Sequence, residues 1–265
     1  MVGVVKSAAR AFDVLEYFEA VCEPLSLKQV ADHFAWPVSS AAALLKSMVV
    51  KGYLDYDRFT RTYMPTMRLA TLGHWVSDKL FEGDEVLAVM RELQDLTGET
   101  ISLGAQSDLQ AQHIHVLPSR SALTVQLRPG TCRPLLRSGL GTLLLSARTD
   151  EIIDRLVRRV NIEQPDPSKR ERFDEVIARV NEVRELGHVY ARHTYVQGAA
   201  IIGMLLPRPR LGRVMAINVI GPDDRLAALH GDIVATLHER LSRMTPRDDA
   251  DTYTSEEMHL DALAP

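Results

Sequence analysis

The sequence predicts an α+β protein built in two parts, and three observations lead to this prediction. A capping-box signature opens two short amphipathic segments between residues 26 and 52, which is the pattern of a helix-turn-helix. A polar loop between two strand-like segments follows at residues 53–64, as in a β-hairpin. From residue 84 on, strand-like and helix-like segments come in blocks, which favours a mostly antiparallel sheet flanked by helices.

The segment from Ser26 to Gly52 carries the features of a helix-turn-helix. Ser26 and Gln29 have the S-x-x-Q spacing of a capping box, in which two side chains satisfy backbone donors at a helix start. Gly52 is suited to end the second helix, and another helix over residues 6–21 should pack behind the pair. The apolar face of the first helix comprises Leu27, Val30, Ala31 and Phe34, and that of the second comprises Ala41, Leu44, Leu45 and Met48.

The hairpin that follows turns the helix-turn-helix into a winged helix. Residues 53–57 and 62–64 are strand-like and flank the polar loop Arg58–Arg61. In a winged helix the second helix of the pair enters the major groove of DNA, and the hairpin tip carries cations toward the backbone or the minor groove. The first 66 residues therefore predict a DNA-binding unit.

We expect four segments in the chain. Residues 1–66 form the winged helix-turn-helix, and residues 67–82 form a linker helix whose apolar surface suits dimerisation. The alternative that this helix only covers the winged helix stays open. Residues 83–245 form the larger α+β domain, and the acidic tail at residues 246–265 is expected to be disordered.

The larger domain contains alternating blocks of helix-like and strand-like sequence. We expect helices at residues 84–97, 138–147, 150–160, 168–186 and 226–244, with a break at residues 161–167. We expect strands at residues 100–106, 112–117, 123–127, 189–193, 199–206 and 213–220.

Composition and charge narrow the class of protein. No apolar run in the 265 residues approaches the roughly 18 to 20 that span a bilayer, and Cys22 and Cys132 suggest no disulfide framework. We therefore expect a soluble cytoplasmic protein with no membrane partner. The net charge of −4 arises in the tail, because residues 1–66 hold seven cations and seven acids. Binding to phosphates would then require that these cations are segregated from the acids.

Short motifs in a fixed order extend the prediction along nearly the whole chain. They begin with the phrase at residues 5–11 and the Leu-Ser-Leu-x-x-Val-Ala match at residues 25–31. Further matches are Pro37-x-Ser39-Ser40, Leu44-Leu45-x-x-Met48, Gly52-Tyr53-Leu54, Thr97-Gly98-Glu99-Thr100, Arg128-Pro129-Gly130, Pro134-Leu135, Gly139-Leu140-Gly141, Leu186-Gly187, Gly198 and Ile220-Gly221-Pro222. In this order and spacing the sequence resembles the IclR family of bacterial transcriptional regulators, up to about residue 244.

The resemblance implies both an architecture and a function. It implies a winged-helix DNA-binding domain, a linker helix that dimerises, and a C-terminal effector-binding domain like the GAF fold. Such regulators bind palindromic operators in double-stranded DNA as homodimers or dimers of dimers (homotetramers). Their small-molecule effectors are typically organic acids or aromatic metabolites.

The resemblance also assigns residues to DNA binding, with departures that weaken direct reading of bases. Family members commonly carry Lys, Thr, His or Tyr, and Arg where this chain has Val38, Ser40, Ala42 and Ala43. The face opposite the apolar one holds Ser39, Ala43, Lys46 and Val50, and bidentate recognition of purines needs Arg, Lys, Asn or Gln. The expected DNA-binding residues are Lys28, Ser39, Ser40, Ala42, Ala43, Lys46, Arg58 and Arg61.

The effector pocket can be placed in the same way. Among its positions only Asn218 brings a polar side chain, so the effector should be largely apolar or aromatic, because an unpaired buried charge is costly. A carboxylate on it could bind the backbone N–H groups near residues 138–140. Family members often have His at Leu136 and Lys at Thr142, and both are replaced here. The expected effector-binding residues are Gly139, Leu140, Ala191, Ile201, Asn218 and Ile220.

The sequence gives little evidence for a metal site or a catalytic site. His113 and His115 stand at i, i+2, on one face of a strand, and could begin a metal site, and Cys132 beside Arg133 could be an activated thiol. Neither has the partners such sites need, and no P-loop or nucleophile elbow is present. Arg155, Arg158 and Arg159 resemble a basic patch but fit a solvated helix face.

We therefore expect no catalytic residues, no metal, no cofactor and no enzymatic activity. One function class is a ligand-responsive DNA-binding regulator. The alternative is a metabolite-binding protein or enzyme whose winged helix serves only as an interaction module.

Overall fold

The computed structural model describes residues 5–83, 85–121, 127–193 and 196–244, which fall into two compact units divided between Lys79 and Leu80. The architecture is α+β, as the sequence predicts, with a helix-turn-helix in the first unit and an antiparallel sheet with helices in the second. No helix of the described residues is long and apolar enough to cross a membrane. The expected acidic tail and most of the expected strand at 123–127 lie outside the described residues, and Leu127 is not in a strand.

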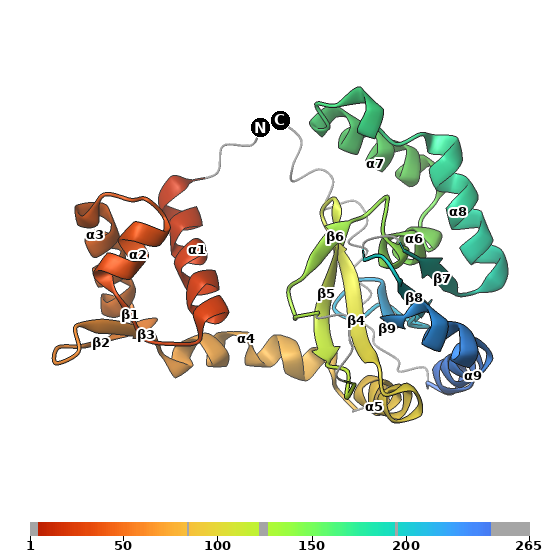
Figure 1. The fold of residues 1–265 in the computed structure, drawn as a ribbon, viewed down its shortest axis with the longest axis horizontal. Helices are drawn as coiled ribbons and strands as arrows, with labels where there is room; N and C mark the ends of the chain where they lie inside the picture. Colours follow the sequence, from red (N-terminus) through yellow and green to blue (C-terminus); the bar gives the residue numbers. More distant parts are fainter. Residues whose placement is uncertain (1–4, 84, 122–126, 194–195, 245–265) are drawn as a thin grey trace. The chain divides into compact units, whose positions relative to one another are not determined.

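The first unit is a winged helix (Figure 1). Its three strands form a small antiparallel sheet in the order β1-β3-β2, in which the two-residue strand β1 pairs with β3. The hairpin β2–β3 was expected, whereas β1 is too short to leave a pattern in the sequence. The elements are α1 (Lys6–Val21), β1 (Leu25–Ser26), α2 (Leu27–His33), α3 (Val38–Val50), β2 (Leu54–Asp57), β3 (Thr62–Pro65) and α4 (Met67–Leu80).

Local chemistry explains where these helices begin and end. The capping box is formed as predicted: Ser26 accepts from the backbone of Gln29, and Gln29 Oε1 accepts from the Ser26 backbone at 2.8 Å. After α3, Gly52 adopts a φ of 78°, which turns the chain toward β2. A compact core then fixes the three helices against the sheet; its buried residues are Val14, Phe18, Leu25, Val30, Leu45, Met48 and Leu54.

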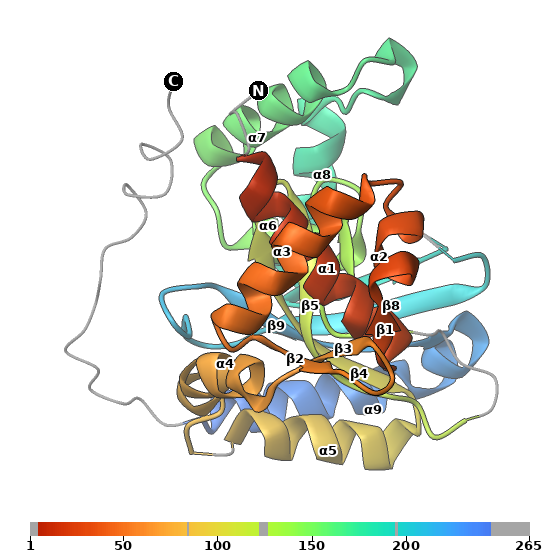
Figure 2. The ribbon, with the colours of Figure 1, turned by 90° about the vertical axis from the view of Figure 1, so that its left-hand side faces the viewer.

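The second unit is built on one six-stranded antiparallel sheet in the order β6-β5-β4-β9-β8-β7. Helices α5 and α9 lie side by side on one face, and α6, α7 and α8 belong to the other (Figures 1 and 2). The strands are β4 (Thr100–Ser107), β5 (Gln110–Leu117), β6 (Cys132–Pro134), β7 (Val189–Arg192), β8 (Ala199–Leu205) and β9 (Met215–Pro222). The helices are α5 (Glu85–Thr97), α6 (Gly139–Ser146), α7 (Asp150–Glu163), the 3₁₀ turn η1 (Pro167–Lys169), α8 (Phe173–Leu186) and α9 (Asp223–Ser242).

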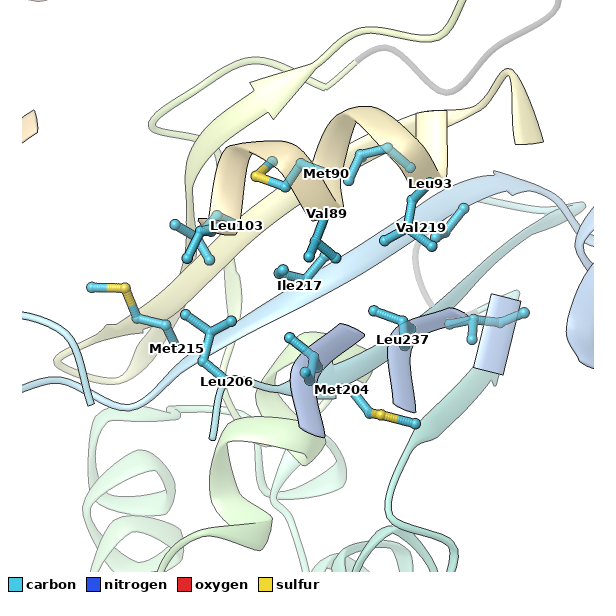
Figure 3. Packing of buried hydrophobic residues seen from close by; sticks show 14 of the residues in the cluster. Val89, Met90, Leu93, Leu103, Met204, Leu206, Met215, Ile217, Val219 and Leu237 are labelled. Atoms are coloured by element: carbon cyan, nitrogen blue, oxygen red, sulfur yellow. The ribbon is translucent and has the colours of Figure 1, made fainter. Parts of the chain in front are cut away.

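Each face of the sheet has its own core. Figure 3 shows the core under α5 and α9, where Val89, Met90 and Leu93 pack toward Leu103 and Ile217 of the strands. The other core lies between the sheet and α6, α7 and α8, and α6 contributes its buried leucines to it. The strands are therefore apolar on both faces, so polar side chains on either face stand out.

The structure corrects the expected helix at residues 168–186, which begins only at Phe173. Asn161 ties down the segment before Phe173, because its side chain donates to the Glu171 carbonyl and accepts from the Glu171 N–H, both at 2.8 Å. The expected break at 161–167 is correspondingly shifted to residues 164–172, since α7 continues to Glu163 and α8 begins at Phe173, and η1 lies within it.

A β-bulge corrects the prediction that His113 and His115 share one face of a strand. His115 pairs with Leu103 and His113 pairs with Gly104, so Ile114 is the extra residue. Because Leu103 and Gly104 are neighbours on β4, the two histidines point to opposite faces. No group of three potential metal ligands occurs among the described residues.

Candidate nucleic-acid interface and effector site

The outer face of α3 carries mostly small, uncharged side chains. Ser39, Ala43, Lys46 and Val50 are exposed, as the helical spacing predicts, and Val50 is 76% exposed. Ser47 is also exposed, but its hydroxyl donates to the Ala43 carbonyl at 2.8 Å. Ser40 and Ala42 are half-buried beside this face. Such a face can contact phosphates and thymine methyl groups, but it has few groups that read purine edges.

The wing is the loop between β2 and β3, and a carboxylate holds its shape. Asp57 Oδ1 accepts from the backbone N–H of Phe59 at 2.7 Å and from that of Thr60 at 3.4 Å. The hydrogen bond from Phe59, the larger influence, and those from Thr60 lower the pKa of Asp57. Figure 1 shows this loop projecting beyond the helices of its unit. Arg58, Phe59 and Arg61 are all exposed on it.

The cations expected to meet DNA have no partner among the residues that the structure describes. Lys28, Lys46, Arg58 and Arg61 are exposed, and their side chains form no hydrogen bond or ion pair with any other residue that the structure describes. The carboxylate nearest to the two wing arginines in sequence, Asp57, is engaged by backbone N–H groups. These four positive charges are therefore available to an external anion.

In the second unit, the start of α6 packs closely on the sheet. A Cβ on Gly139 would lie 2.5 Å from Ile201 Cγ2 and 2.8 Å from Ala191 Cβ. A Cβ on Gly104 of β4 would lie 2.5 Å from Leu140 Cδ2. Ile201 pairs with both Ala191 and Ile220 across the strands. Gly139, Ala191, Ile201 and Ile220 thus come together, and Asn218 lies two residues before Ile220 on the same face of β9. We call the six expected effector-binding residues the α6 cluster: Gly139, Leu140, Ala191, Ile201, Asn218 and Ile220.

A buried polar row crosses the sheet beside these residues. It comprises Asn218 on β9, Ser102 opposite it on β4, and His113 on β5, with exposed fractions of 0%, 0% and 3%. His113 Nδ1 lies 3.0 Å from Ser102 Oγ, and the Asn218 amide donates to the carbonyls of Ala216 at 3.3 Å and Ser102 at 3.5 Å. Among the described residues nothing donates to the Asn218 side-chain oxygen.

The electrostatics of the polar row keep it neutral. Burial, with a smaller contribution from the nearby Arg133 charge, lowers the pKa of His113 to about 4, so its ring is uncharged at neutral pH. Gly203, opposite Asn218, leaves the space in which the amide lies, since a Cβ there would be 2.3 Å from the side-chain oxygen. The row therefore offers neutral hydrogen-bonding groups on an apolar floor.

Two open hollows of about 460 and 500 Å³ lie elsewhere on the second unit, between α9 and the end of α8. They share Gly187, Met204 and His238, and neither includes a residue of the α6 cluster. The α6 cluster is instead packed, with Leu140 1% and Ile220 8% exposed.

Two segments of the sequence match known families in the same order as the two units. Residues 7–58 match the IclR helix-turn-helix domain, and residues 84–243 match the C-terminal domain of the bacterial transcriptional regulator IclR. The chain belongs to the IclR family. It is a DNA-binding transcriptional regulator, and regulators of this family bind DNA and small-molecule effectors.

Individual relatives are distant but cover most of the chain. The transcriptional repressor AllR of Escherichia coli (strain K12) is 24% identical over 229 residues, which are 82% of this chain and 80% of AllR. The IclR regulator from Alicyclobacillus acidocaldarius has a similar fold, with a TM-score of 0.69 at 18% identity, over 91% of this chain and 97% of that one. The effector domain of an IclR regulator from Acinetobacter sp. ADP1 is 29% identical, with a TM-score of 0.58, over 64% of this chain and 99% of that domain.

In this IclR regulator the predicted DNA-contact residues lie on α3, at the start of α2 and on the wing, whereas the sequence missed part of the polar row. Ser102 and His113 lie on strands where alternation alone cannot say which face they occupy. The α7 arginines are not a free basic patch, because Arg158 binds Asp154 at 2.7 Å and Arg159 binds Asp108 at 2.5 Å. No signal in the sequence reports such pairing across 51 residues.

Proposed function

We propose that this IclR regulator binds a palindromic operator as a homodimer or a dimer of dimers, and that a small, largely apolar or aromatic metabolite held by the α6 cluster alters this binding. The observation that supports DNA contact by the winged helix is a set of exposed cations that bind no other side chain in the described part of the chain: Lys28, Lys46, Arg58 and Arg61. Free cations gain most from a polyanion, because they release its counterions without first breaking an internal pair.

The proposed contacts divide into two kinds. Lys28, Lys46, Arg58 and Arg61, with the hydroxyl groups of Ser39 and Ser40, bind phosphates and set the orientation of the unit. Ala42 and Ala43 contact thymine methyl groups in the major groove. This division predicts strong salt dependence and modest discrimination by α3.

The linker helix α4 supports the proposed dimer. Met67, Leu72 and Trp75 are 79%, 51% and 60% exposed on it. A second copy of the chain would remove this apolar area from water, which is the main favourable contribution to association. Two copies related by a twofold axis would then place two α3 helices on the half-sites of a palindrome.

The α6 cluster favours a particular class of effector. Its apolar residues suit an aromatic or aliphatic body, and the free oxygen of Asn218 suits a hydroxyl or amide donor on the ligand. A carboxylate, if the ligand carries one, would bind the backbone N–H groups of Gly139 and Leu140 at the start of α6. Because these residues are packed together, binding requires α6 to shift from the sheet, which is a route by which ligand could change the dimer.

A salt titration tests the DNA-binding part of the proposal. The purified protein is titrated against the DNA upstream of its own coding region and against unrelated DNA of equal length, at several salt concentrations. We expect tighter binding to the upstream DNA, with an affinity that falls steeply as salt increases. Equal, salt-insensitive binding to both would contradict the proposed contacts.

A glycine pair tests the effector site. Gly139→Ala should abolish the effect of aromatic and aliphatic carboxylic acids on operator affinity, because the new methyl group would overlap Ile201 and Ala191 and change the packing of the α6 cluster. Gly231→Ala on α9 is the matched control, since no atom lies within 4 Å of its Cβ position. A normal ligand response in Gly139→Ala, with operator binding intact, would contradict this assignment.

A further inference from the structure

The most exposed large apolar side chain of the described residues lies at the tip of the wing. Phe59 is 100% exposed, between Arg58 and Arg61. Burying a phenylalanine contributes roughly 1.5–3 kcal/mol to folding, and this residue obtains none of it. Single exposed apolar residues are common on proteins, so the surroundings of Phe59 must decide whether it has a role.

The loop holds Phe59 in one place instead of letting it fold back. The Phe59 N–H donates to Asp57, as described above, and the Thr60 hydroxyl lies 2.7 Å from that of Thr62. Arg61 has a φ of 55°, the left-handed conformation that closes the turn. Below the loop, Tyr56 and Tyr63 pack across the two strands at 4.8 Å between ring centroids. The ring is therefore presented to the outside on an ordered backbone, which lowers the backbone entropy lost on binding.

Helix α3, which should read the bases, has few side chains able to do so, and this leaves a role in specificity for Phe59. Its exposed face offers Ser39 and Lys46 as the hydrogen-bonding groups, with Ala43 and Val50 beside them. Sequence selection can instead come from the energy of deforming DNA, which depends on the base step even where no edge is read. Proteins that work this way often insert an apolar side chain between base pairs from the minor groove.

We propose that Phe59 is a minor-groove wedge: its ring inserts against a base step beside the half-site, while Arg58 and Arg61 bind the phosphates on either side of it. The wedge bends the operator and makes binding favour flexible pyrimidine–purine steps at that position. This role rests on the DNA-binding function proposed above and adds a source of specificity to it.

The experiment uses the full chain and the duplex that the wild-type protein selects from a pool of random sequences. Phe59→Ala should weaken binding to this duplex about 10- to 100-fold, the range found when stacking on a base is lost. It should also reduce the bend, measured by energy transfer between dyes at the two ends of the duplex. The slope of log affinity against log salt should stay unchanged, because no charge is altered.

Phe12→Ala is the matched control, because Phe12 on α1 is also exposed, at 65%, and lies outside the wing. We expect it to leave both affinity and bend unchanged, and Phe59→Trp to retain the bend. If Phe59→Ala binds and bends the selected duplex as the wild type does, the wedge is refuted while DNA binding stands. If the wild-type protein selects no duplex at all, both the wedge and the proposed function are refuted.

Discussion

The two units of this regulator use their cations in opposite ways. In the unit from Leu80 on, many arginines are paired with carboxylates: Arg184 lies 2.8 Å from Asp150, and Arg225 lies 2.9 Å from Glu99. Among the described residues up to Lys79, the only ion pair joins His74 and Asp78 at 2.8 Å. Lys28, Lys46, Arg58 and Arg61 of the winged helix are exposed and bind no described carboxylate, although the first 66 residues contain as many acids as bases.

This difference shows that the pairing of individual cations decides whether a domain can bind phosphates, more than its net charge does. A neutral domain looks unsuited to DNA, but a phosphate interacts with particular charges and not with their sum. Where an arginine already binds a carboxylate, an external anion must compete for it. Where the arginine binds no carboxylate, its charge can bind an external anion without such competition. Removing a cation should therefore weaken DNA binding in the first unit and lower the free energy of unfolding in the second.

The largest effect is expected where a cation covers a buried carboxylate. Glu99 is 1% exposed, and burial raises its pKa although the Arg225 charge opposes this. Arg225→Ala leaves that carboxylate without its partner, which costs about 3–5 kcal/mol in buried pairs. We expect a large drop in the urea midpoint of the full chain, followed by circular dichroism at pH 7.

Two further measurements make this prediction specific. The destabilisation should shrink at acid pH, because Glu99 then binds a proton and no longer needs a cation. Adding Glu99→Gln to Arg225→Ala should recover part of the loss, since a neutral amide is less costly to bury. A loss below about 1 kcal/mol for Arg225→Ala alone would show that the pair behaves like an exposed one.

A smaller effect on stability is expected from His113, the buried neutral histidine of the second unit. The pKa of His113 is lowered to about 4 in the folded protein, below its ordinary value of 6.5. Between these two pH values the unfolded chain binds a proton that the folded chain does not, so stability should fall as pH drops from 6.5 to 4. The loss from this group reaches about 3 kcal/mol. His113→Gln should remove that part of the pH dependence in urea unfolding, and an unchanged profile would contradict it.

The smallest effect is expected for an exposed pair. Arg158 and Asp154 lie one helical turn apart on α7, and the arginine side chain is 75% exposed. Exposed pairs of this kind contribute little, so Arg158→Ala should change the free energy of unfolding by less than about 0.5 kcal/mol. A larger loss would mean that pairing in the second unit is a source of stability and not only of charge neutralisation.

Patterns confined to neighbouring residues were predictable from the sequence. The helix at residues 6–21 and the capping box of Ser26 and Gln29 depend on contacts within one or two turns, and the structure contains both. The α6 cluster was assembled from a resemblance, and the structure brings its members together.

Features that depend on contacts between distant segments were not predictable. Strand β1 has two residues and exists because β3 pairs with it. The bulge at Ile114 breaks the alternation of β5 and separates His113 from His115. The bonds between Asn161 and Glu171 delay the start of α8. The exposure of Phe59, and the lack of any described carboxylate bound to Arg58 and Arg61, are likewise visible only in the folded chain.

The central claim is that the free cations of the winged helix bind DNA phosphates. The most direct test measures the slope of log affinity against log salt, on the selected duplex, for two double variants with the same loss of charge. Lys46→Ala with Arg61→Ala should make the slope shallower by about 0.9 for each lost phosphate contact. Arg158→Ala with Arg159→Ala, which removes paired cations of α7, should leave the slope as in the wild type. Equal slopes for the two variants would contradict the claim.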